Sequence, residues 1–168
     1  MRLRVNRPAT PLHVVLVEPE IPQNTGNIAR LCAATGSPLH LVGGLGFRTD
    51  DKAVRRAGLD YWHLVQVKKH TDLRTCLDKI GCIEPLLFTT KSERSYLDAP
   101  FRLGGALVFG KETKGLDSSI IEAYPSSSFA IPTMEDSVRS LNLANAVSVV
   151  VYEALRATGA LEDAVPGS

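Results

Sequence analysis

Short apolar runs alternate with helical segments along most of the chain, and this alternation limits the folds that it can adopt. The runs that we interpret as strands cover residues 12–17, 39–42, 63–67, 85–90, 106–109 and 129–132. Apolar spacing, capping residues and stop glycines predict helices over residues 28–36, 50–59, 72–81 and 141–157. Strands that alternate with helices indicate an α/β fold, with a mostly parallel sheet covered by helices on both faces.

The length and charge of the chain set broad limits on its class. With 168 residues and a formal net charge of +1, it fits one domain, and any nucleic-acid binding must come from local patches. We expect a single domain over residues 12–158 with flexible tails at 1–11 and 159–168. No run reaches the roughly 18 apolar residues of a membrane span, and the start of the chain lacks the apolar stretch of a secretory signal. A cytoplasmic protein is the expectation.

The cysteines and histidines give no sign of a metal or hydrolytic site. No CxxC pair occurs among the three cysteines, and we expect reduced, buried thiols at Cys32, Cys76 and Cys82. The four histidines lie outside the polar clusters described below, so strand-edge or helix-surface positions are predicted for His13, His40, His63 and His70. No metal is expected, and a Ser-His-Asp arrangement has no obvious parts.

Three polar clusters stand next to the predicted strands and the last predicted helix. They cover residues 24–30, 110–115 and 139–145. In open α/β sheets, ligands bind where strands end, so three such clusters in one small domain predict a single site. The phosphate-loop pattern and the G-x-G-x-x-G pattern are both absent. Each cluster also has an ordinary interpretation as surface or capping residues, such as an N-cap at Ser140 or Asn142.

The last predicted helix is apolar around most of its circumference. Its apolar side chains are Ala146, Val147, Val149, Val150, Val151, Ala154 and Leu155. A helix that is apolar on all sides needs a cover beyond its own sheet, and a homodimer formed through this helix would supply one. The alternative is a central helix of the core.

The three polar clusters also carry a family resemblance. Residues 19–30, 109–116 and 140–147 resemble the three ordered motifs of the SPOUT superfamily of RNA 2′-O-methyltransferases (TrmH class), and the similarity extends over about residues 12–158. It is strongest to the short, single-domain branch that methylates the tRNA wobble nucleotide, at position 34, on cytidine or a modified uridine. The resemblance implies a C-terminal deep trefoil knot, S-adenosylmethionine as the methyl donor, a homodimer, and the tRNA anticodon stem-loop as partner.

The resemblance also implies catalytic roles. Arg30 would act on the ribose 2′-OH, and Asn24 would position Arg30 or an RNA phosphate. Because a guanidinium barely deprotonates, we favour Arg30 as an electrostatic stabiliser of the nascent alkoxide, with a proton-accepting role left open. Glu112 would orient Arg30 or a neighbouring backbone segment. Ser140 and Asn142 would line the site.

Cofactor and RNA contacts follow in the same way. The resemblance implies cofactor contacts at Phe88, Gly110, Ile131, Ser140 and Leu141. Basic side chains contact phosphates, and aromatic rings stack on unpaired bases. We therefore expect RNA contacts at Lys52, Arg55, Arg56 and Tyr61. The alternative for these four is a solvated helix face with core aromatics. The loop over residues 133–139, which borders the cofactor, is about one residue longer than in similar family members.

Three other functions remain open from the sequence. The same chemistry could act at another tRNA position or on ribosomal RNA. A catalytically silent RNA-binding module could share the fold. A flavodoxin-like nucleotide binder fits the alternation of strands and helices but explains none of the three motifs.

Overall fold

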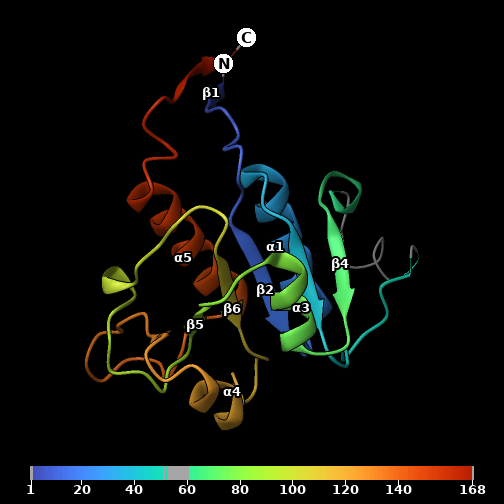
Figure 1. Cartoon of the computed structure of the whole chain (residues 1–168), viewed down its shortest axis with the longest axis vertical. Coiled ribbons are helices and arrows are strands. Elements are labelled where there is room, and N and C mark those ends of the chain that lie inside the picture. Colours follow the sequence, from blue (N-terminus) through green and yellow to red (C-terminus); the bar gives the residue numbers. More distant parts are fainter. Residues whose placement is uncertain (1, 51, 53–60, 168) are drawn as a thin grey trace.

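The computed structural model describes residues 2–50, 52 and 61–167, which form an α/β domain around a six-stranded sheet (Figure 1). The strand order is β4-β3-β2-β6-β5-β7, and all five neighbouring pairs are parallel. The strands are β2 (His13–Val17), β3 (Leu39–Val42), β4 (Val67–His70), β5 (Leu86–Phe88), β6 (Ala106–Phe109) and β7 (Ser128–Phe129). The predicted fold class, a mostly parallel sheet with helices, is therefore confirmed.

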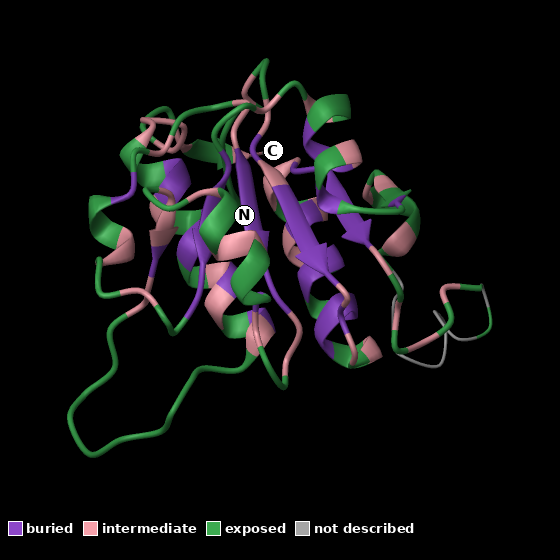
Figure 2. Ribbon diagram, turned by 60° about the horizontal axis from the view of Figure 1, so that its bottom comes forward, coloured by how far each residue is buried: buried purple, intermediate pink, exposed green. Residues whose placement is uncertain are grey.

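Helices cover both faces of the sheet. They are α1 (Pro22–Thr35), α3 (Leu73–Ile80), α4 (Ser118–Ala123) and α5 (Leu143–Ala157), with short 3-10 turns at Trp62–Leu64 and Tyr96–Asp98. Side chains alternate between the faces of a strand, so Val14 and Leu16 of β2 pack with α1 and α5, whereas Val15 and Val17 pack with α3 and α4. Figure 2 shows the result: the central strands are buried, and the helices keep exposed outer faces.

Helix α5 combines a buried side with an apolar exposed side. Val147, Val150 and Ala154 are fully buried against the sheet and α1. Val149 is 38% exposed and Tyr152 is 48% exposed. Within the described part of the chain, no helix has both the length and the apolar character needed to cross a membrane.

Several predicted elements differ from the observed ones. The strand predicted at 63–67 is wrong, because Trp62–Leu64 forms a 3-10 turn and β4 follows at Val67–His70. This edge strand exposes Lys68 and Lys69, so it lacks the apolar run of a central strand. Helix α4 was not predicted, and β7 is shorter than the predicted 129–132. The helix predicted at 50–59 falls mostly outside the described residues.

Helix α1 begins six residues before the predicted start at Ile28 (28 − 22 = 6). Pro22 occupies its first turn, where the missing N–H costs nothing. Asn24 and Thr25 are buried although they are polar, so apolar periodicity gives no signal for this first turn. The motif residues 24–30 therefore lie on a helix instead of in a loop after the strand.

The two ends of the chain lie side by side. Strand β1 (Arg2–Arg4) pairs antiparallel with β8 (Val165–Gly167), so that Leu3 faces Pro166 (Figure 1). Both segments belong to the tails that are expected to be flexible, since neither has an apolar run that predicts a strand. Their pairing is a backbone ribbon that stands apart from the six-stranded sheet.

The histidines depart most from the expected surface positions. His63 is exposed as predicted, but His40 and His70 are buried and His13 is partly buried. These three come from the neighbouring strands β2, β3 and β4, and their rings follow one another in a hydrogen-bonded row. The prediction of strand edges or helix surfaces is therefore wrong for His40 and His70, because consecutive parallel strands bring them together inside the fold.

Candidate active site

A cavity of about 520 Å³ opens beyond the carboxyl ends of β5 and β6. This is the edge of a parallel sheet at which ligands bind. Segments that are distant in the sequence form its walls: residues 88–90, 109–115, 130–133 and 139–141, with Leu143 and Ala146. All five residues predicted to contact the cofactor are among them, namely Phe88, Gly110, Ile131, Ser140 and Leu141. Two predicted catalytic residues, Glu112 and Ser140, also line the cavity.

A tight loop after β6 shapes one wall of this cavity. The Gly115 N–H donates to the Lys111 carbonyl at 2.9 Å, which folds residues 110–115 back on themselves. A Cβ added at Gly110 would lie 2.1 Å from the Gly115 carbonyl carbon, so only glycine fits there. Gly115 itself has φ +66°, a conformation that favours glycine. The two glycines of the motif are therefore requirements of the loop.

Glu112 ties this loop to the start of α1. Its carboxylate accepts hydrogen bonds from the backbone N–H of Glu20 at 2.8 Å and of Ile21 at 3.0 Å. It also accepts from Asn24 Nδ2 at 3.2 Å. Hydrogen bonds to an ionised carboxylate are strong, so Glu112 fixes the chain where it enters the helix. Of the two predicted roles for Glu112, the geometry fits the orientation of neighbouring backbone.

Glu20 makes the reciprocal connection. Its carboxylate accepts from the Thr113 backbone N–H at 3.1 Å and from the Thr113 hydroxyl at 3.0 Å. A further link joins Lys111 Nζ to Glu18 at 3.1 Å, and this hydrogen bond raises the pKa of Lys111 above its ordinary value. The β2–α1 connection and the loop after β6 are thus held together from both sides.

Asn24 and Asn142 complete what we call the motif network, which consists of Asn24, Glu112 and Asn142. Asn24 is 6% exposed, and its Oδ1 accepts from Asn142 Nδ2 at 3.0 Å. Asn142 Oδ1 in turn accepts from the Ala144 N–H at 2.9 Å, as the predicted N-cap of α5. Three side chains therefore join the three sequence motifs, which lie up to 118 residues apart.

Arg30 is not part of the motif network. It is an exposed residue of α1, and its guanidinium carbon is 4.8 Å from the centre of the Tyr61 ring. That distance is typical of a cation–π contact. Arg30 does not line the cavity. Of the predicted RNA contacts, Lys52 and Tyr61 are exposed, whereas Arg55 and Arg56 lie outside the described residues.

Sequence reasoning missed some residues of the site. Thr89 and Thr90 line the cavity directly after β5, at a strand end like those next to the motifs. They were missed because the strand predicted at 85–90 includes them. Glu20 and Thr113 stand inside the motifs without an assigned role. Their pairing across 93 residues leaves no signal in a single sequence.

The protein is a parallel α/β domain with a cavity at the carboxyl edge of its sheet, where side-chain hydrogen bonds join the three motifs. These features are typical of a ligand-binding α/β enzyme. The chain belongs to the SpoU rRNA Methylase family, whose model matches residues 11–152.

Individual relatives are similar over nearly their whole length. The tRNA (cytidine(34)-2′-O)-methyltransferase of Escherichia coli (strain K12) is 49% identical over 149 residues, covering 88% of this chain and 94% of the relative. The protein of the same name from Yersinia pestis is 49% identical over 154 residues, with the same shares covered. A solved structure concerned with the 2-OH methylation of C/U34 on tRNA is 44% identical with a TM-score of 0.79, covering 88% of this chain and 95% of its own.

Proposed function

We propose that this protein is an S-adenosylmethionine-dependent tRNA methyltransferase. It methylates the ribose 2′-OH of the wobble nucleotide, position 34, where the base is cytidine or a modified uridine. The observation that carries the proposal is a cavity lined by two of the motifs and joined to the third by hydrogen bonds of Asn24, in a chain that is 49% identical to a tRNA (cytidine(34)-2′-O)-methyltransferase.

The cavity suits S-adenosylmethionine in size and chemistry. Its volume of about 520 Å³ is within the usual range for small-molecule sites. Phe88, Ile131 and Leu141 offer apolar surface for an adenine ring, and the backbone at Gly110 and Ser140 offers hydrogen-bonding groups for its polar edge and the methionine tail. When bound, the cofactor supplies an electrophilic methyl group. Methyl transfer to the 2′-oxygen then requires that the acceptor is aligned with the methyl group and that the hydroxyl proton is removed.

The motif network supplies the alignment. Glu112 and Asn142 hold Asn24 from opposite sides, so the amide stands in one orientation beside the cavity. Arg30, outside the cavity of its own chain, serves the acceptor ribose and not the cofactor. Its guanidinium stabilises the negative charge that develops on the 2′-oxygen. Tyr61 holds Arg30 and, with Lys52, Arg55 and Arg56, contacts the anticodon stem-loop.

The proposed assembly is a homodimer through α5. The exposed Val149 and Tyr152 on this helix are the apolar surface that a second copy would cover. The family resemblance further implies that the C-terminal segment is threaded as a trefoil knot. A cytoplasmic location agrees with free thiols at Cys32, Cys76 and Cys82.

The test is methyl transfer from isotopically labelled S-adenosylmethionine into tRNA that lacks the modification. Digestion and mass spectrometry would locate the label. We expect 2′-O-methylcytidine or a 2′-O-methyluridine derivative in anticodon fragments, with little or no label after Arg30→Ala. Arg74→Ala is the matched control, because Arg74 is an exposed helix arginine that is far from the motifs in sequence and pairs with Asp78.

One second candidate has a specific observation in its favour. The matching family model is described as an rRNA methylase family, so ribosomal RNA is the alternative acceptor. Label that appears in ribosomal RNA but not in tRNA would replace the proposed substrate and keep the chemistry. Bound cofactor without label in either RNA would instead indicate a silent RNA-binding module.

A further inference from the structure

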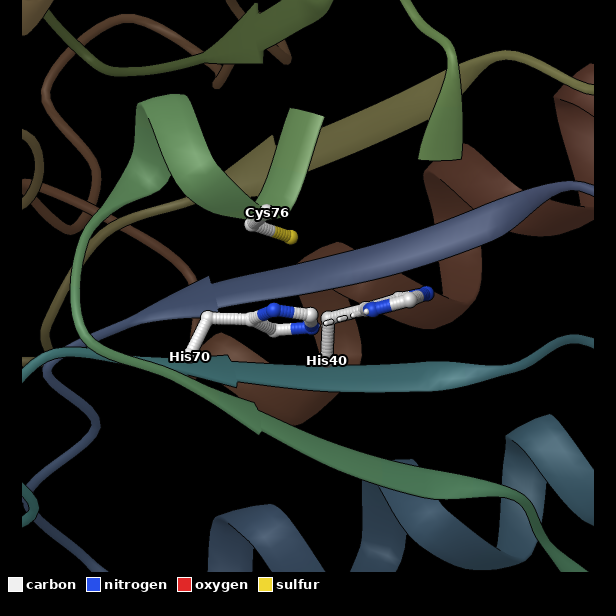
Figure 3. A group of neighbouring side chains, drawn as sticks. All are labelled: His40, His70 and Cys76. Carbon is white, nitrogen blue, oxygen red and sulfur yellow. Dashed lines mark hydrogen bonds between the residues drawn. The ribbon is translucent and has the colours of Figure 1, made fainter. Parts of the chain in front are cut away.

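Two histidines and a cysteine meet inside the domain, away from the cavity. His40 comes from β3, His70 from the end of β4, and Cys76 from α3, which covers this face of the sheet (Figure 3). They are 1%, 8% and 0% exposed. One possible metal-ligand atom from each lies within 4.8 Å of the other two. We call these three residues the histidine cluster, and none of them lines the cavity.

The hydrogen bonds of the cluster leave one nitrogen without a partner. His40 Nδ1 and His70 Nε2 are 2.9 Å apart and share a ring proton. The other nitrogen of His40, Nε2, is 3.0 Å from His13 Nδ1. Among the described residues, nothing bonds to His70 Nδ1, although this atom is buried. Buried polar atoms normally have a partner, and this one can carry the ring proton of His70 when Nε2 binds a ligand.

We propose that the histidine cluster is a binding site for a transition-metal ion of the Zn²⁺ type. Imidazole nitrogen and thiolate sulfur are the ligands that Zn²⁺ prefers, and the absence of a carboxylate from the cluster disfavours Mg²⁺ and Ca²⁺. The ion binds between His40 Nδ1 and His70 Nε2, and the ring proton that these atoms share moves to His70 Nδ1. Cys76 Sγ is the third ligand. His13 accepts the remaining His40 N–H and so fixes which His40 nitrogen faces the ion.

The protonation states agree with this assignment. Burial lowers the pKa of His40 to about 3 and also lowers the pKa of His70, so both rings are neutral near pH 7 and offer lone pairs. Burial raises the pKa of the Cys76 thiol to about 12. Binding therefore releases the thiol proton to solvent: the S–H bond breaks, a metal–sulfur bond forms, and no electron is transferred.

The nearby charges set a mild bias on the affinity. The positive charges of Lys68 and Lys79 lie near the histidine rings and oppose the binding of a metal cation, whereas the negative charge of Asp72 favours it. The neighbouring thiol of Cys82 also acts on Cys76 and adds to the rise of its pKa. Since one proton leaves for each ion bound, the apparent affinity should rise with pH over the neutral range.

The sequence could not reveal this site. His40 and His70 are 30 residues apart, and Cys76 follows His70 by six positions (76 − 70 = 6), which matches no zinc motif. Only the order of three adjacent strands and the position of α3 above them create the cluster. No metal is expected from the sequence, so the proposed site departs from that expectation; it is separate from the methyl-transfer reaction.

The test uses the full, untagged chain after metal removal by a chelator. Co²⁺ should bind one ion per chain with a thiolate-to-cobalt charge-transfer absorption, and Zn²⁺ should displace it. Cys76→Ala should abolish the absorption, and His70→Asn should abolish tight binding. Cys82→Ala is the matched control and should keep both. His13→Phe should weaken binding by roughly 10–100-fold without removing the absorption, as expected for a residue that orients a ligand.

Two outcomes would overturn the proposal. One is a wild-type chain that binds Co²⁺ and Zn²⁺ no better than the Cys76→Ala and His70→Asn variants. The other is an absorption that survives Cys76→Ala but disappears in Cys82→Ala, which would assign the metal to the other thiol. If Cys76→Ala fails to fold by circular dichroism, the wild-type measurement and His70→Asn decide the question. Methyl transfer by these variants, which leave the cavity intact, separates this test from that of the proposed function.

Discussion

Asn24, Glu112 and Asn142 lie beside an open cavity and bond to one another and to backbone N–H groups, whereas His40, His70 and Cys76 lie inside the fold with one imidazole nitrogen unpaired. The motif network is complete without a ligand, so it holds its geometry before substrate arrives. The histidine cluster is incomplete by one interaction. The motif network holds its geometry through its own hydrogen bonds, whereas the histidine cluster brings together the ligand atoms of a metal site and one buried nitrogen that can carry a ring proton.

Among the following variants, the largest effect is expected from weakening the motif network at Glu112. Glu112→Gln removes the charge that accepts from Glu20, Ile21 and Asn24, so the start of α1 shifts relative to the cavity. A misplacement of about 1 Å in an active site can lower the rate by about 100-fold. We expect kcat/KM for tRNA methylation to fall by about that factor. Glu122→Gln, on the exposed side of α4, is the control, and equal activity of the two variants would contradict a positioning role.

A pH series on metal-free protein probes the other region. The pKa of His40 is about 3 in the folded chain and 6.5 when unperturbed, so the unfolded chain binds a proton that the folded chain does not. Stability is therefore complete above about pH 6.5 and falls as pH drops toward 3, by at most about 1.4 kcal/mol per pH unit from this group. Denaturant unfolding with chelator present, at pH 7, 6 and 5, measures the slope. The slope should decrease in His40→Gln, and an unchanged slope would show that His40 does not carry it.

Variants of Asn142 can separate its role as the N-cap of α5 from its hydrogen bond to Asn24. Asn142→Ala loses the cap of α5 and should cost about 1 kcal/mol in the free energy of unfolding. Asn142→Asp keeps an oxygen for the Ala144 N–H but cannot donate to Asn24. We expect the Asp variant to keep most of the stability and to lose activity. Thermal unfolding together with kcat measurements would show whether both properties instead change in step, which would reduce Asn142 to a cap.

The smallest effect is expected at the edge of the first region, where Tyr61 meets Arg30. Tyr61→Leu removes a contact worth about 0.5–1 kcal/mol at an exposed site, so kcat/KM should fall only a few-fold. Tyr61→Phe keeps the ring and should behave like wild type. A Phe variant as impaired as the Leu variant would mean that the hydroxyl group, and not the stacked ring, is what matters.

The sequence predicted the central sheet well because β2, β3 and β6 are uninterrupted apolar runs. It misplaced β4 because an edge strand with Lys68 and Lys69 has no such run. It predicted the five residues implied for the cofactor, and all of them line the cavity, since each belongs to a strand end or to a motif. It could not predict the Asn142–Asn24–Glu112 hydrogen bonds or the His40–His70 contact, because these depend on which strands become neighbours.

Two tRNA substrates that differ by a single oxygen would decide whether the wobble ribose is the methyl acceptor. One carries a normal ribose at position 34, and the other carries 2′-deoxyribose there. We expect one methyl group per molecule on the first and none on the second, with equal binding of both. Undiminished methylation of the deoxy substrate would show that the acceptor lies elsewhere and would contradict the assignment of the cavity and its three motifs to the wobble ribose.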